Sequence, residues 1–288
     1  MCCAECTDPN VRVEEDYLAV SDGVALRTID FIPPCDTPER PMVVFVAGWI
    51  SLIGSWKDVL EKLTPCYRTL YVETREKISA RLPEGARVDF SMPRMGRDIR
   101  EVLEHKVGSE KKFFFAGSSL GSTVILDYLS RESRQPEMTF LVAPICELIY
   151  PFWLPLVIKP LPPPFYTIVI KPFLKWYLRN VRLDRKKEPE QVKKYENALD
   201  AADPRRLKAN AFAIKDYSLW EKLPDVRSPV LIIGARSDTL HGLDVMDRMI
   251  ELIPDADMEI MASNKETHSE KMGQLIVDRI NSLHYVER

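Results

Sequence analysis

One stretch, Phe113 to Gly121, constrains the fold of this chain more than any other. It reads Phe-Phe-Phe-Ala-Gly-Ser-Ser-Leu-Gly and is followed by a helix-like segment, residues 122–131. An apolar run that ends in Gly-x-Ser-x-Gly before a helix predicts a strand, a sharp turn and a helix, with Ser119 at the apex. Gly117 and Gly121 flank the turn, where a Cβ atom would collide with neighbouring backbone. The pattern predicts a strained, accessible serine at the edge of a sheet.

Further apolar runs of strand length recur along the chain, at Met42–Ala47, Thr69–Val72, Phe113–Ala116, Met138–Ala143 and Val230–Ile233. Such runs suit parallel strands that are covered on both faces. Helical patterns lie between the runs, one with Ser91 as its expected N-cap and one with an apolar stripe from Met272 to Leu283. Val11–Val20 and Val24–Phe31 flank a turn and predict an antiparallel hairpin. The predicted fold class is α/β, with a mostly parallel, doubly wound sheet.

This alternation of strands and helices breaks after Pro144. We predict a core of residues 10–143 and 225–288 and an inserted helical cap of residues 144–224. A transmembrane span is the rival interpretation of the apolar part, but prolines, Lys159 and Lys171 divide it into pieces shorter than the ~20 residues that a spanning helix needs. The favoured interpretation is a cap that lines an apolar pocket, with peripheral contact to a membrane as the less favoured alternative.

Composition excludes several classes of function. The 288 residues carry a formal net charge of -3 and no basic stripe, which argues against binding to nucleic acid. The six cysteines have neither the paired spacing nor the nearby histidines of a zinc site, so no metal is expected. Cys2, Cys3 and Cys6 are interpreted as loose thiols on a frayed terminus, with weak metal binding or modification as alternatives. No secretory signal is visible, which favours the cytoplasm.

A serine hydroxyl needs a base to accept its proton and a group that orients this base. The chain has four histidines. His105 and His284 lie in helical segments and are expected at the surface, and His241 follows a loop that leads into a helix. His268 lies in a polar loop between the strand at Met258–Met261 and the terminal helix. His268 is the predicted base, because a loop there can reach a serine at the edge of the sheet.

The orienting acid is expected before the histidine in the chain. Asp238 ends the stretch Leu-Ile-Ile-Gly-Ala-Arg-Ser-Asp, which reads as a buried strand released by a glycine. A simpler interpretation makes Asp238 the N-cap of the helix that begins near Leu240. Its position between Ser119 and His268 favours the catalytic role, and Glu147 is the second choice.

Two backbone donors are expected to stabilise the oxyanion of an acyl-transfer reaction. The N–H of Leu120 stands at the start of the helix after Ser119. The second donor is expected from the loop Ala47–Ser51, where Gly48 permits a close approach and the N–H of Trp49 is the natural candidate. The indole ring of Trp49 can pack in the core at the same time.

Together these residues make the chain resemble the α/β-hydrolase superfamily from about Val11 onward. The resemblance rests on Gly48-Trp49, the Gly117–Gly121 turn, Asp238 and His268. It implies the α/β-hydrolase fold with a helical cap after the sixth strand, a catalytic triad, and no metal or organic cofactor.

The chain departs from the family pattern in two loops. Ala47 stands where many relatives have a histidine that braces the oxyanion loop. Residues Glu73–Ile78 keep an acid and an arginine but lack both glycines of the turn that relatives often show after the fourth strand. We therefore expect this loop to turn differently. Arg75 or Lys77 could face the pocket and meet a substrate carboxylate, and the alternative is a surface ion pair.

The predicted function is a serine hydrolase that cleaves a carboxylic ester or thioester of a small or medium, largely apolar molecule through an acyl-enzyme intermediate. Trp153 and Trp176 of the cap are candidate substrate contacts, although aromatic side chains more often fill a cap's own core. The same triad could instead perform carbon–carbon cleavage or acyl transfer. The remaining alternative is a non-catalytic binding protein, which the complete set of triad residues disfavours. The sequence does not predict the oligomeric state.

Overall fold

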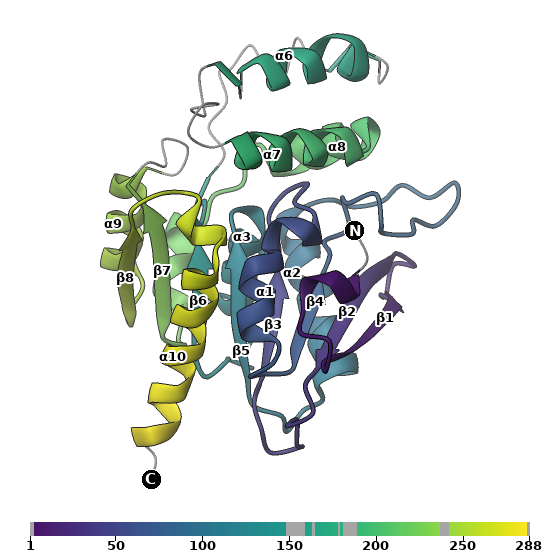
Figure 1. Ribbon diagram of the computed structural model, residues 1–288. Helices are drawn as coiled ribbons and strands as arrows, with labels where there is room; N and C mark the ends of the chain where they lie inside the picture. The colour runs from purple at the N-terminus through teal and green to yellow at the C-terminus, as the bar shows by residue number, and fades with distance from the viewer. Residues whose placement is uncertain are drawn as a thin grey trace.

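The protein is built around one eight-stranded sheet with the order β1-β2-β4-β3-β5-β6-β7-β8 (Figure 1). The computed structural model describes residues 3–147, 159–162, 165–177, 179–180, 189–236 and 242–286. The first two strands are antiparallel to each other, and β2 is antiparallel to β4. All other neighbouring strands pair in parallel. The predicted fold class, a mostly parallel sheet behind an antiparallel hairpin, is confirmed.

The strands coincide with the apolar runs of the sequence. Their bounds are Arg12–Ala19 (β1), Ala25–Ile32 (β2), Met42–Val46 (β3), Thr69–Val72 (β4), Phe113–Ser118 (β5), Thr139–Val142 (β6), Val230–Ala235 (β7) and Ala256–Met261 (β8). Every residue of β3 to β7 is buried, as expected for parallel strands that helices cover on both faces. Only the edge strands β1 and β8 carry several exposed side chains.

Helices cover both faces of this sheet (Figure 1). Helix α1 (Lys57–Leu63) and the terminal helix α10 (Glu270–Val286) pack together on the face toward the viewer. Helices α2 (Met92–Val102) and α3 (Leu120–Leu129) pack together on the opposite face, and α9 (Leu243–Leu252) packs on β7 and β8. Short helical turns complete the described core: η1 (Cys3–Cys6), η2 (Ile53–Trp56), η3 (Leu103–Val107), η6 (Trp220–Asp225) and η7 (Glu266–His268).

A layer of helices lies above the carboxyl ends of the parallel strands (Figure 1). Between β6 and β7 the described residues form η4 (Tyr166–Ile170), α6 (Lys171–Tyr177), α7 (Pro189–Ala201) and α8 (Pro204–Ile214). This stretch belongs to the range for which the sequence predicts an inserted cap. Among the helices of the described ranges, none combines the length and the apolar character needed to span a membrane.

The N-terminal cysteines correct one expectation from the sequence. Cys3 and Cys6 form the turn η1, and both side chains are buried against the core. Burial raises the pKa of the Cys6 thiol to about 11. These two residues are therefore packed core residues and not thiols on a frayed terminus, because the turn places them against α1 and η2. Within the described ranges, no three His, Cys, Asp or Glu residues are grouped so that they could hold a metal ion.

Candidate active site

Ser119 occupies a strained turn between β5 and α3. Its backbone has φ 46° and ψ -119°, a combination that residues with a Cβ rarely adopt. The N–H of Ser119 donates to the carbonyl of Val142 at 2.8 Å, which fixes the turn to the neighbouring strand β6. Helix α3 begins at the next residue, Leu120. The strand, turn and helix predicted from Gly-x-Ser-x-Gly are therefore present, with Ser119 at the apex.

The two flanking glycines are required by close approaches of backbone and side chains. A Cβ atom on Gly121 would lie 2.1 Å from the carbonyl oxygen of Val46 in β3. A Cβ atom on Gly117 would lie 2.6 Å from the Ile125 side chain and 3.2 Å from the N–H nitrogen of Ser122. All three separations are shorter than van der Waals contact, so a larger residue at either position would push α3 away from the sheet. The glycines thus hold the start of α3 beneath Ser119.

The loop after β3 lies directly beside this turn. A Cβ atom on Gly48 would be 3.3 Å from the Cβ of Ser119, and the N–H of Gly48 donates to the Ser118 hydroxyl at 2.9 Å. The next residue is Trp49, and among the described residues no hydrogen bond uses its backbone N–H. The N–H of Leu120 is the first of α3 and has no partner within the helix. Both predicted oxyanion donors therefore lie on segments that adjoin Ser119.

His268 ends the short turn η7, at the start of α10. Its ring stacks on Trp56 with 4.3 Å between the ring centroids and 30° between the planes. Its Nδ1 lies 3.0 Å from the Thr267 hydroxyl and 3.2 Å from the carbonyl oxygen of Asn264. The tautomer that carries its proton on Nδ1 leaves Nε2 as the basic nitrogen, which is the arrangement that a general base needs.

Trp56 was not anticipated as part of the site. It is fully buried, and its indole N–H donates to the Ser51 hydroxyl at 2.9 Å, so it joins the loop after β3 to the histidine ring. Trp56 lies thirteen positions before the first residue of β4, in a segment without a recognisable motif. Its contact with His268 is a tertiary one, which a single sequence does not reveal.

The predicted acid, Asp238, and the predicted pocket residue Trp153 lie outside the described residues. Glu147, the second choice for the acid, is exposed and pairs with Ser218 in an isolated bridge. Its backbone is tied to the segment before β7. His105, expected at the surface, is exposed in the η3 turn.

The sequence left two roles open for Arg75, a contact to a substrate carboxylate or a surface ion pair, and the structure shows a buried ion pair. Its side chain is 0% exposed, and it donates to both carboxylate oxygens of Asp98 at 2.6 Å. It also donates to Asp22 at 2.7 Å and to the carbonyl of Asp89 at 2.8 Å. These four hydrogen bonds engage all three nitrogens of the guanidinium group. Arg75 therefore joins the turn after β4 to α2 and to the β1–β2 turn.

Trp176, the other cap residue predicted to contact substrate, is exposed. It lies on α6, its side chain is 55% exposed, and it stacks on Phe173 with 6.0 Å between the ring centroids. It does not line the cavity beside the loop after β3. Helix α6 forms the part of the upper layer that lies farther from the sheet than α7 and α8 (Figure 1).

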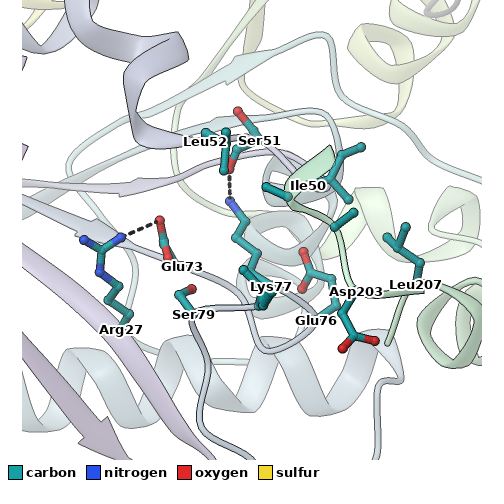
Figure 2. Close-up of a pocket in the computed structure, with 13 residues that line it drawn as sticks. Arg27, Ile50, Ser51, Leu52, Glu73, Glu76, Lys77, Ser79, Asp203 and Leu207 are labelled. Carbon is teal, nitrogen blue, oxygen red and sulfur yellow. Dashed lines mark hydrogen bonds and ion pairs between the residues drawn. The ribbon is translucent and has the colours of Figure 1, made fainter. Parts of the chain in front are cut away.

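Lys77 instead fills the space beside the loop after β3. The side chain is 7% exposed, and its ammonium donates to the carbonyl oxygen of Ser51 at 2.8 Å (Figure 2). Burial lowers the pKa of Lys77 and raises the pKa of its neighbour Glu76. Lys77 thus stabilises the loop after β3. In this loop Ala47 replaces the histidine that has a stabilising role in many relatives.

A cavity of about 110 Å³ opens at this point. Its lining comes from the loop after β3, the turn after β4 and the junction of α7 and α8, with Arg27 of β2 at one side (Figure 2). Arg206 of α8 donates to the carbonyl oxygens of Lys77 and Ala80, which ties the upper helices to the turn after β4. The cavity is therefore enclosed jointly by the core and the inserted helices.

The sheet, the strained serine turn and the flanking helices define an α/β-hydrolase. A family model described as serine aminopeptidase, S33, matches residues 83–269, which is more than half of the chain and includes Ser119 and His268. The chain belongs to this family of the α/β-hydrolases. None of the curated proteins matches the chain.

Solved structures show the same fold. An enol-lactonase from Burkholderia xenovorans is 17% identical, with a TM-score of 0.75 over 92% of this chain and 100% of that one. A thermophilic esterase from Thermogutta terrifontis is also 17% identical, with a TM-score of 0.75 over 94% and 99% of the two chains. A hydrolase from Pseudomonas aeruginosa is 18% identical, with a TM-score of 0.73 over 93% and 97%. At these identities the likeness concerns the fold.

Proposed function

We propose that the protein is a serine hydrolase that cleaves a carboxylic ester or thioester through an acyl-enzyme intermediate. The observation that carries the proposal is the φ of 46° at Ser119. A non-glycine residue in this region costs about 1–3 kcal/mol and persists only where surrounding contacts enforce it. Here the contacts at Gly117 and Gly121 enforce it, and the result is a serine placed at the N-terminus of a helix.

In the proposed mechanism, Ser119 Oγ attacks the carbonyl carbon while His268 accepts its proton. The negative charge that develops on the carbonyl oxygen is stabilised by the backbone N–H groups of Leu120 and Trp49. Asp238 orients the imidazole and supports its positive charge. His268 then protonates the leaving alcohol or thiol, and water attacks the acyl-serine with His268 as the base. Apart from the substrate and water, each step uses only groups of this chain.

We also propose that residues 144–224 act as a cap over Ser119. Two contacts support a role beside the site. Asn264, in the loop that carries His268, donates to the hydroxyl of Tyr195 on α7 at 3.2 Å. Arg206 on α8 donates to the turn after β4. A cap that contacts both the loop of His268 and the turn after β4 can shape the entrance to the active site and exclude water from it.

The test combines covalent labelling with turnover. A fluorophosphonate probe should label the wild-type protein and not Ser119→Ala, and p-nitrophenyl esters should be hydrolysed at least about 10³-fold faster by the wild type. Ser130→Ala, at the end of α3, is the matched control and should behave as the wild type. Equal turnover by wild type and Ser119→Ala would refute the assignment of the nucleophile.

Product analysis separates hydrolysis from the alternatives that use the same serine. Hydrolysis of a thioester gives the free acid even when a competing alcohol is added. Acyl transfer would give the new ester, and carbon–carbon cleavage would require a substrate without an ester. A protein that neither reacts with the probe nor turns over any ester would support the non-catalytic alternative.

A further inference from the structure

The cavity beside the loop after β3 contains buried polar atoms without partners. Glu76 is 2% exposed, and its Oε2 atom has no hydrogen-bond partner among the described residues. Its other oxygen accepts a bond from the Thr74 hydroxyl at 2.7 Å. The hydroxyl of Ser79 is also buried and has no partner there. Both residues line the same cavity. Buried polar atoms are normally hydrogen-bonded, and one left without a partner is destabilising, so two in one cavity indicate a site that a ligand completes.

Lys77 provides donors in the same cavity. Its ammonium carries three N–H groups, and its one hydrogen bond among the described residues goes to the carbonyl of Ser51. Figure 2 shows this side chain between the loop after β3 and Glu76. The cavity therefore presents acceptor and donor groups from adjacent residues of one turn.

The other charges that line the cavity have partners. Arg27 and Glu73 pair with each other at 3.3 Å (Figure 2). Asp203 caps α8, where its carboxylate accepts from the N–H groups of Arg205 and Arg206. The groups that await a ligand are thus Glu76, Ser79 and the remaining N–H groups of Lys77.

The mixture of charges favours a neutral ligand group. A carboxylate would approach the side chains of Glu76 and Asp203, and an ammonium group would approach Lys77 and Arg27. A hydroxyl group donates one hydrogen bond and accepts others without a net charge. The cavity of about 110 Å³ can hold such a group with a few carbon atoms, since a single water needs only about 10–15 Å³ by this kind of measure.

The cavity is also close to the reacting serine. Ile50 lines it, and Gly48, two residues earlier, adjoins the side chain of Ser119. Two residues of chain span at most about 7 Å. We propose that the cavity is a substrate subsite for a hydroxyl group, with Glu76 as acceptor and Lys77 as donor. This inference rests on the proposed function, because it places the hydroxyl on the ester that Ser119 attacks.

The test compares matched esters, with the hydroxyl on either side of the scissile bond. One pair is p-nitrophenyl butyrate and p-nitrophenyl 3-hydroxybutyrate, and the other is ethyl and 2-hydroxyethyl butyrate. The readout is the ratio of kcat/KM for the hydroxylated ester to that for its plain partner. We expect the wild type to prefer the hydroxylated ester in one pair, and that pair identifies the acyl or the alcohol side.

Glu76→Leu should lower this ratio at least about tenfold, since a hydrogen bond to a charged group is lost. Glu76→Gln keeps an acceptor oxygen and should lower the ratio less, and it serves as the second variant if the leucine protein does not fold. Glu84→Leu makes the same substitution on an exposed loop and should keep the wild-type ratio. A wild-type preference in neither pair, or equal ratios for wild type and Glu76→Leu, would mean that the cavity holds only water.

Binding to Ser119→Ala separates this inference from the proposed function. Saturation-transfer NMR with one ester pair reports which ester binds better without any reaction. Suppose that the hydroxylated ester binds better, that Glu76→Leu removes this preference, and that the wild type hydrolyses neither ester. This result would support the subsite and refute the hydrolase. Turnover of both esters without any preference would retain the hydrolase and refute the subsite.

Discussion

Two turns at the same edge of the sheet are held by opposite means. The turn after β5, Gly117–Gly121, carries no charged side chain and is fixed by close approaches of the backbone. The turn after β4, Glu73–Lys77, carries four charged residues out of five, and all five are buried. The first turn needs residues without side chains, and the second is held by the ion pairs of Glu73 and Arg75.

This difference explains how the turn after β4 forms without the glycines of its relatives. Arg75 joins it to Asp98 in α2 and to Asp22 between β1 and β2. Arg94 extends the network, since its guanidinium donates to Asp98 and to Glu101 at 2.9 Å each. Buried charges can hold a backbone in place, provided that each one is paired. The stability of the turn then depends on each partner, so the loss of any one of them should destabilise it.

The largest effect should therefore come from Arg75→Met. It leaves Asp98 buried without its bidentate partner, and breaking a buried pair costs about 3–5 kcal/mol. The free energy of unfolding, measured by urea denaturation, should fall by this amount. The double variant Arg75→Met/Asp98→Leu should recover part of the loss, because it removes the stranded charge. A loss below about 1 kcal/mol for the single variant would show that the network does not hold this turn.

Gly121→Ala tests the other turn. The added methyl group meets the carbonyl of Val46 in β3, which cannot rotate away, so we expect a loss of roughly 1–3 kcal/mol from overpacking. Hydrolysis should fall more than stability, because α3 and Ser119 shift together. Gly85→Ala is the control: it has a φ of 70° but nothing within 4 Å of the added carbon, and should leave hydrolysis unchanged. Unaltered turnover by Gly121→Ala would argue against a fixed elbow.

The two turns also differ in how far the sequence predicts them. The constraint on Gly117 and Gly121 is local, because a tight strand–turn–helix connection requires them wherever it occurs. Arg75 depends on Asp98, 23 positions away, and on Asp22, 53 positions away. Nothing in the residues around Arg75 distinguishes a buried ion pair from a pocket cation or a surface ion pair, so the sequence alone left its role open.

The same reasoning applies to the rest of the site. Apolar runs predicted the sheet, and the motif order selected Ser119 and His268, which the fold places at the same edge. The stacking of Trp56 on His268 and the bond from Lys77 to Ser51 join segments that no local pattern relates. The assignments of Ser119, Asp238 and His268 as a triad and of Trp49 and Leu120 as donors remain predictions for the labelling and kinetic tests.

Lys77→Met tests the contact between the turn after β4, to which Lys77 belongs, and the loop after β3, whose Ser51 carbonyl accepts its hydrogen bond. The loss of one donor to the Ser51 carbonyl should lower kcat for a plain ester about tenfold. Stability should change little, since the variant also removes the cost of burying an ammonium group. Lys62→Met removes a lysine from a surface ion pair with Glu270 and should leave kcat unchanged. An unchanged kcat for Lys77→Met would show that the loop holds its shape unaided.

The smallest effect concerns the dependence of stability on pH at Glu76. Burial raises the pKa of this carboxyl above its ordinary value of 4.5, so the folded protein binds the proton more tightly than the unfolded chain. This contributes stability that is fully present below pH 4.5 and is lost as the pH rises through the folded-state pKa. Glu76→Gln has no such proton to lose. The free energy of unfolding of Glu76→Gln should therefore increase relative to that of the wild type as the pH rises above about 4.5. Glu84→Gln should show no such trend. A constant difference between Glu76→Gln and the wild type from pH 4 to 8 would mean that a partner stabilises the charged carboxylate, and would place Glu76 with Arg75 among the paired charges of the turn.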